Sequence, residues 1–141
     1  MEFNALVPLM CEVASRFTPK EAPVELNLVG ERRMAELNRA YRGRRGATEI
    51  LTFDYTDTKT TPPDPGNPIG EIYLCWRKIT GNARAKGVSN RDYLLRLLVH
   101  GLCHLQGYQH GDEISAARME AIEKNHLSSF LSKRRMALLF T

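Results

Sequence analysis

The segment from about Asn90 to Leu105 constrains the fold more than any other part of this sequence. Its aliphatic residues fall on most sides of a helix, and they are Leu94, Leu95, Leu97, Leu98, Val99, Leu102 and Leu105. A helix that is apolar around most of its circumference has to be buried at the centre of a domain. Ser89 is the expected N-cap of this helix, and the acidic Asp92 suits its first turn.

The same helix carries two histidines at a spacing that suits metal binding. Four residues of α-helix turn through about 400°, so His100 and His104 lie on one face, roughly 40° apart. Gly107 can end the helix in a left-handed turn and bring His110 back to that face. Three histidine ligands leave one tetrahedral position open for water, which is the arrangement of a catalytic zinc site. We therefore expect one zinc ion per chain.

Simpler interpretations of these residues are available. A single histidine on a helix is more often structural than a ligand, but three of the four histidines in this chain fall within eleven positions. That clustering favours the metal site, and we interpret the fourth, His126, as structural or solvated. Cys103 is adjacent to His104 and could be a ligand. We favour packing, because free cysteine is commonly buried.

Gly101 argues against a metalloprotease. The histidine spacing matches the metzincin pattern, in which a glutamate follows the first histidine and accepts a proton from the zinc-bound water. Gly101 occupies that position here and has no side chain to accept a proton. Peptidase activity is therefore not expected, and any hydrolysis must use the metal together with some other group that stabilises the substrate.

Length and composition favour one ordinary globular domain, which we expect to span residues 1–141. The net charge of +4 is too mild to indicate a nucleic-acid partner by itself. No apolar stretch approaches the roughly 20 residues needed to cross a bilayer, and the N-terminal residues lack a secretory signal. The three cysteines are far apart and do not suggest disulfides. We expect a cytoplasmic protein with no membrane partner.

Local patterns predict an α+β fold, with a small mixed sheet packed against helices around a central, buried, zinc-binding helix (a zincin-like arrangement). Helices are expected at about 4–17, 32–41, 77–86, 90–105 and 112–131, and strands at 24–29, 48–53 and 69–75. Met34, Leu37 and Tyr41 should be the buried residues of the second helix. Residues 54–68 should form a surface loop. The basic triplet Lys133-Arg134-Arg135 suits the C-terminus of the last helix.

Three blocks of this sequence are similar, in order and spacing, to one known family. The blocks are His100–His110 (HGLCHLQGYQH), Leu37–Gly43 followed by Thr48–Phe53, and Gly70–Cys75. They resemble the histidine signature, the arginine loop and the strands of the bacterial YbeY family of rRNA maturation endoribonucleases. The resemblance covers roughly residues 24–115. Gln109, Glu49 and Glu71 stand where the family usually has aspartate, and Gln109 alone loses the charge, which could alter metal binding.

The resemblance implies a zinc-dependent, single-strand-specific endoribonuclease acting in 16S rRNA maturation and ribosome quality control. By position it implies that His100, His104 and His110 are the zinc ligands and that Arg42 is the functional, catalytic arginine. Phosphodiester cleavage gathers negative charge, which a guanidinium can stabilise. Arg42, Arg44 and Arg45 fall in one glycine-flanked basic loop and are candidate substrate-binding residues. For Arg44 and Arg45, a solvated surface role is equally compatible with the sequence.

The expected partners are single-stranded RNA, an rRNA precursor, and the ribosome or a ribosomal protein, with no DNA expected. The main alternative is a ribosome-associated assembly factor that binds RNA or protein, with a structural zinc and little catalysis. A hydrolase of small phosphoesters or amides is a further alternative, and no residue pattern supports a specific small-molecule pocket.

Overall fold

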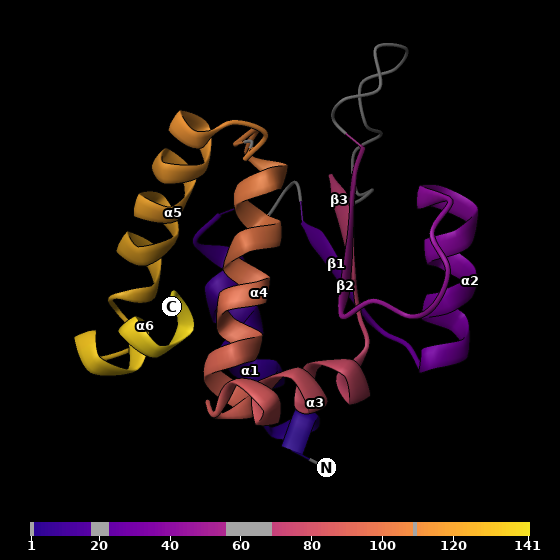
Figure 1. The fold of residues 1–141 in the computed structure, drawn as a ribbon, viewed down its shortest axis with the longest axis horizontal. Helices are drawn as coiled ribbons and strands as arrows, with labels where there is room; N and C mark the ends of the chain where they lie inside the picture. The colour runs from indigo at the N-terminus through magenta and orange to yellow at the C-terminus, as the bar shows by residue number, and fades with distance from the viewer. Residues whose placement is uncertain (1, 18–22, 56–68, 109) are drawn as a thin grey trace.

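A computed structural model of the chain describes residues 2–17, 23–55, 69–108 and 110–141. These residues form the predicted α+β fold, with the three expected strands and six helices, one more than the five expected (Figure 1). In chain order they are α1 (Glu2–Ser15), β1 (Val24–Leu28), α2 (Glu31–Arg42), β2 (Ile50–Asp54), β3 (Gly70–Leu74), α3 (Trp76–Lys86), α4 (Asn90–Leu105), α5 (Glu113–Leu127) and α6 (Lys133–Leu139). Most of the predicted loop at 54–68, from residue 56 onward, lies outside the described residues, and so does Gln109. Within the described part, no helix combines the length and apolar character needed to cross a membrane.

The sheet is small and mixed, with the strand order β1-β3-β2. β1 runs parallel to β3, and β2 runs antiparallel to it. Ile72, at the middle of β3, pairs with Leu26 on one side and Thr52 on the other, and it is fully buried. Figure 1 shows α2 on one face of the sheet and α1 and α4 on the other. The alternating side chains of β3 therefore contribute to two separate cores.

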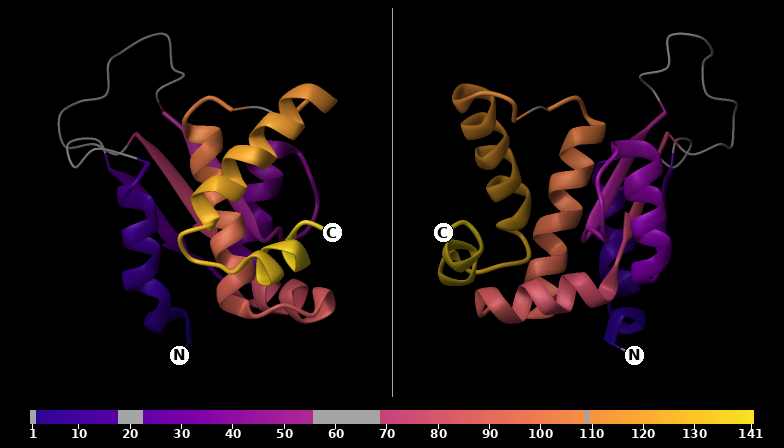
Figure 2. Two further views of the ribbon diagram at one scale, coloured as in Figure 1. Left: turned by 90° about the vertical axis from the view of Figure 1, so that its left-hand side faces the viewer. Right: turned by 45° about the vertical axis from the view of Figure 1, so that its right-hand side comes forward.

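The helix α4 is the centre of the larger core, as its apolar circumference predicts. It contacts β2 together with α1, α3, α5 and α6, and α5 and α6 lie on its side away from the sheet (Figure 2). Ser89 caps the helix as expected, since its hydroxyl accepts from the backbone N–H of Asp92 at 3.1 Å. A helix that is buried over most of its surface gives the side chains on its remaining face a rigid base.

Gly101 marks the closest approach of α4 to the sheet. A Cβ atom at this position would lie 3.0 Å from Oγ1 of Thr52 and 3.3 Å from Cδ1 of Ile72. Both separations are shorter than comfortable van der Waals contact between carbon and its neighbours. The packing of α4 on the sheet thus explains why this chain has glycine at the position where the protease pattern has glutamate.

One expectation about the buried residues of α2 was wrong. Tyr41 is 67% exposed, because it lies near the end of α2, where its ring makes a T-shaped contact with Phe53 at a centroid distance of 5.0 Å. Asn38 is the residue buried one turn earlier on α2, and its side-chain amide donates to the carbonyl of Gly46 at 2.9 Å. A polar residue therefore replaces the expected tyrosine under the helix and anchors the chain that follows it.

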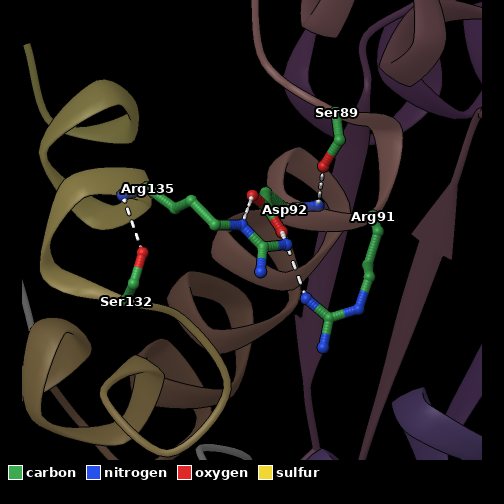
Figure 3. A network of polar contacts seen from close by, with 5 residues as sticks. All are labelled: Ser89, Arg91, Asp92, Ser132 and Arg135. Carbon is green, nitrogen blue, oxygen red and sulfur yellow. Dashed lines mark hydrogen bonds and ion pairs between the residues drawn. The ribbon is translucent and has the colours of Figure 1, made fainter.

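The basic triplet begins a helix instead of ending one. Ser132 caps α6 by accepting from the backbone N–H of Arg135, at 3.2 Å. The guanidinium of Arg135 donates two hydrogen bonds, of 2.8 and 2.5 Å, to the buried carboxylate of Asp92 (Figure 3). Arg91 donates to the same carboxylate at 3.1 Å. The buried acid on α4 offsets the cost of arginine in the first turn of α6, which the helix dipole alone would disfavour.

Candidate metal centre

The structure brings the three predicted histidines together at the C-terminal end of α4. The Nε2 atoms of His100 and His104 are 3.1 Å apart, as one helical turn on the same face requires. Each of His100, His104 and His110 can offer one ring nitrogen such that these atoms all lie within 4.8 Å of one another. His100 and His104 are partly buried, whereas His110 is exposed.

The turn that returns His110 to the helix depends on Gly107. This residue adopts φ of +94°, in the left-handed region, as predicted. Its N–H donates to the carbonyl of His104 at 2.9 Å, and the N–H of Tyr108 donates to the carbonyl of Cys103 at 3.2 Å. These two bonds are those of a Schellman motif, which satisfies the last carbonyls of α4 and reverses the chain.

The other ring nitrogens of two histidines are already engaged. Nδ1 of His104 lies 3.0 Å from the carbonyl oxygen of Tyr108, and because a carbonyl only accepts, that nitrogen carries the proton. Nδ1 of His100 is bonded to the carboxylate of Glu123 on α5. Both rings therefore keep Nε2 for the shared site. Burial, and secondarily the neighbouring His100, lowers the pKa of His104, which favours the neutral imidazole that a metal ion requires.

This arrangement of nitrogens fits a metal ion. Zinc with Zn–N bonds of about 2.0–2.1 Å in tetrahedral geometry separates two ligand nitrogens by about 3.3 Å, close to the 3.1 Å between the two helical Nε2 atoms. Imidazole donors suit zinc, copper, iron and nickel. The triad could hold a metal ion, and its three ligands would leave a position open to solvent.

Glu123 is the residue of this site that the sequence interpretation missed. Its side chain is almost fully buried, with Met119 and Leu127 buried one turn on either side. A glutamate at the centre of an i, i+4, i+8 apolar stripe is a detectable signal, because carboxylates are almost never buried without a partner. Its role here resembles the carboxylate that orients a metal-ligating histidine in many metal sites.

Cys103 packs in the core, as we expected. It is fully buried, and burial, with a smaller effect from Glu123, raises the pKa of its thiol to about 12. Within the described residues, the cluster able to hold a metal consists of the three histidines without this cysteine. His126 also matches its structural interpretation, because its ring packs against Phe17 at a centroid distance of 4.2 Å.

A cleft of about 790 Å³ runs along α4 and contains the histidines. Arg42 and Arg44 line it from the α2 side, but Arg45 does not. Arg42 is the last residue of α2 and not part of the loop, because the helix continues until Gly43 ends it with φ of +66°. The backbone N–H of Gly43 donates to the carbonyl of Arg39 at 3.1 Å, which fixes the direction in which the chain leaves the helix.

Glu49 and Glu71, the two glutamates at positions where the family resemblance leads us to expect aspartate, have different surroundings. Glu49 lines the cleft and accepts hydrogen bonds from Tyr93 of α4 and, at 2.7 Å, from Asn82 of α3. Burial, and secondarily this bond to Glu49, raises the pKa of Tyr93. Glu71 is not among the residues that line the cleft and accepts from the hydroxyl of Tyr73 at 2.7 Å. Glu49 thus fastens the start of β2 to the helices that form the cleft.

Comparisons with known proteins agree with one another. The sequence model of the family described as endoribonuclease YbeY matches residues 2–131. Proteins named endoribonuclease YbeY from Cupriavidus metallidurans and from Azoarcus sp. strain BH72 are 37% identical over 109 residues and 38% identical over 108 residues. These matches cover 77% and 76% of this chain but 53% and 43% of the two relatives. The chain thus spans about half the length of the curated relatives it matches.

A solved structure is similar over most of the fold. The solution structure of TM1509 from Thermotoga maritima superimposes with a TM-score of 0.56 at 25% sequence identity. The match covers 90% of this chain and 85% of that one.

Proposed function

The chain belongs to the endoribonuclease YbeY family, and from this premise we propose that it is a zinc-dependent endoribonuclease that cleaves single-stranded RNA. One observation carries the proposal. The three histidines that could hold a metal ion share one cleft with Arg42 and Arg44. A metal site beside guanidinium groups suits a phosphodiester, whose transition state gathers negative charge.

In this proposal each group has a separate task. When bound by His100, His104 and His110, zinc supplies a Lewis acid for a phosphoryl oxygen and lowers the pKa of coordinated water to about 7. Glu123 holds the ring of His100 in the orientation that keeps Nε2 directed at the site. Arg42 acts as the catalytic arginine and pairs with the charge of the reacting phosphate, while Arg44 and Arg45 contact the neighbouring RNA backbone.

Membership of the family supports a further proposal about the biological role. We propose that the substrate is an rRNA precursor in the cytoplasm and that the protein acts in 16S rRNA maturation and ribosome quality control, in contact with the ribosome or a ribosomal protein. The absence of a glutamate at Gly101 leaves room for a second function, that of an assembly factor whose zinc is structural. In that case the same cleft would bind RNA and cleave it little or not at all.

Cleavage assays with controlled metal content test the proposal. We expect the purified protein to contain about one zinc per chain and to cut single-stranded RNA faster than the matching duplex or single-stranded DNA. A chelator should abolish cleavage, and added zinc should restore it. A His104→Ala protein purified in parallel controls for contaminating nucleases.

A zinc-loaded protein that leaves RNA intact would contradict the enzymatic proposal. If that protein also binds ribosomal particles, the assembly-factor function replaces it.

A further inference from the structure

Arg96 is a cleft residue that neither the motif nor the family blocks single out. It lies on α4 four residues before His100, so the two side chains share one face of the helix, about 6 Å apart along its axis. Arg96 lines the same cleft as the three histidines and Arg42. A third guanidinium therefore stands one helical turn from the metal site, on the opposite wall from Arg42.

The C-terminal segment of the chain holds Arg96 in place. Its Nη1 donates to the carbonyl oxygen of Leu139, and its guanidinium lies 4.1 Å from the centroid of the Phe140 ring. Lys86 also reaches this segment and donates to the carbonyl of Thr141 at 3.1 Å. Contacts to a neutral carbonyl and a ring fix the guanidinium without neutralising its charge.

The same segment is firmly attached to α4 at a second point. Arg135, at the start of α6, holds the buried carboxylate of Asp92, one turn before Arg96 (Figure 3). The family match ends at residue 131, so the whole of α6 and the residues after it lie beyond the matched region. The support for Arg96 is consequently a feature of this chain and not of the matched family pattern.

We propose that Arg96, held by the C-terminal segment, binds an RNA phosphate next to the one that is cleaved. The inference rests on the proposed function for the identity of the ligand. A guanidinium has five N–H donors, and the bond to Leu139 uses one of them, which leaves others for phosphate oxygens. Its position fits a neighbouring phosphate better than the reacting one, because Arg96 lies a full helical turn from His100.

The decisive variant is Arg96→Gln, because glutamine keeps an N–H donor for the Leu139 carbonyl while it removes the charge. With zinc-loaded protein and a fluorescein-labelled single-stranded oligoribonucleotide, we expect Kd and KM to rise about tenfold, with kcat within about threefold of wild type. The slope of log Kd against log salt should fall by about 0.7, the value for one phosphate contact on a single strand. Zinc content should stay unchanged.

Two further variants separate the effect of the charge of Arg96 from the effect of the contact with Phe140 that holds its side chain. Arg96→Lys should keep the salt slope and recover part of the affinity, because lysine retains the charge and loses the fork of donors. Phe140→Leu should weaken binding by about threefold with the slope intact, since it removes the aromatic face against which the guanidinium lies and leaves the charge of Arg96 in place. Arg32→Ala is the matched control, because Arg32 is 96% exposed at the far end of α2 from Arg42.

The outcomes distinguish this inference from the proposed function. If Arg96→Gln binds the oligoribonucleotide with the Kd and salt slope of wild type, the role of Arg96 is refuted even if RNA is cleaved. If wild type binds RNA, Arg96→Gln binds it more weakly and neither cleaves it, Arg96 is an RNA-binding residue and the endoribonuclease proposal fails. If wild type does not bind the oligoribonucleotide at all, both fail.

Discussion

On one side of the cleft, the rings of His100 and His104 are held by hydrogen bonds to the rest of the fold. His100 bonds to the buried carboxylate of Glu123, and His104 bonds to the carbonyl of Tyr108. On the other side, Arg42 and Arg44 extend from the end of α2 and are exposed. We refer to the three histidines as the histidine wall and to these two arginines as the arginine wall. In the arginine wall the backbone is anchored, through Gly43 and through Asn38, while the side chains reach into the cleft.

The difference matches what each wall would bind. A metal ion tolerates errors of only a few tenths of an ångström in ligand position, so its ligands need rigid support. A flexible RNA backbone presents its phosphates in many arrangements, and long exposed side chains can follow them. The comparison predicts that substitutions behind the histidine wall act through the metal, whereas substitutions in the arginine wall act through RNA alone.

The largest effect is expected from His104→Ala. Removing one of three ligands should eliminate stoichiometric zinc and reduce RNA cleavage to background. It should also lower the melting temperature, because a ligand at 1,000 times its Kd stabilises the fold by about 4 kcal/mol. Elemental analysis, cleavage assays and thermal unfolding measure the three results. His126→Ala, which changes a histidine outside the site, should retain its zinc, and retention of zinc by His104→Ala would remove the histidine wall from the metal site.

Glu123→Gln tests the support behind the histidine wall. Loss of an outer carboxylate partner typically weakens metal binding by about 10–100-fold, and we expect a change in that range from competition with a chromophoric chelator. Glu120→Gln is the control, because Glu120 lies on the same helix with its side chain 45% exposed. Equal zinc affinity in wild type and Glu123→Gln would show that the histidine wall needs no such support.

Arg42→Ala tests the arginine wall. Cleavage should fall at least about tenfold, equivalent to about 1.4 kcal/mol of transition-state stabilisation, with zinc content and melting temperature unchanged. Arg42→Lys should recover only part of the rate, because it keeps the charge and loses the bidentate fork. Wild-type cleavage by Arg42→Ala would mean that the arginine wall is a solvated surface. Loss of zinc in this variant would contradict the prediction that substitutions in the arginine wall affect RNA binding and leave the metal in place.

The smallest effect is expected from His126→Gln, on the loss of folding stability at acid pH. His126 lies outside both walls and serves as a reference. Burial, and secondarily Arg16, lowers the pKa of His126 from 6.5. As the pH falls below 6.5, His126 is protonated in the unfolded chain before it is protonated in the folded protein. The contribution of His126 to the free energy of unfolding is therefore present above pH 6.5 and is lost as the pH falls toward the lowered pKa of the folded state. In metal-free protein, His126→Gln should reduce this loss, measured by urea unfolding at a series of pH values.

The pKa of His104 is also lowered, so part of the acid dependence should survive in His126→Gln. Complete disappearance of the dependence would mean that the histidine wall contributes nothing to it.

The parts of the fold that depend on local sequence were predicted well. The bounds of α4, its Ser89 cap and the left-handed turn at Gly107 all follow from interactions within a few residues. The pairing of His100 with His104 follows from helix geometry in the same way. Each of these features is decided by backbone rules that act over one or two turns.

The features that the sequence did not predict are contacts between distant segments. Glu123 meets His100 across 23 positions, and Arg135 meets Asp92 across 43. The charge of Arg135 suits a helix C-terminus by local rules, but its carboxylate partner on α4 stabilises it at a helix N-terminus. Tyr41 shows the opposite error, since helical periodicity predicts which face is apolar but not where the neighbouring sheet stops. Pairings of this kind become visible only when the packing of the helices is known.

The close contact at Gly101 also limits how this protein can evolve. A lineage that substituted glutamate there would have to fit a longer side chain where even a Cβ atom crowds Thr52 and Ile72. Overpacking of this kind typically costs about 1–3 kcal/mol, and smaller residues at Thr52 or Ile72 would reduce that cost. The close packing of α4 on the sheet therefore disfavours a carboxylate at the one position where a metzincin protease carries its proton acceptor.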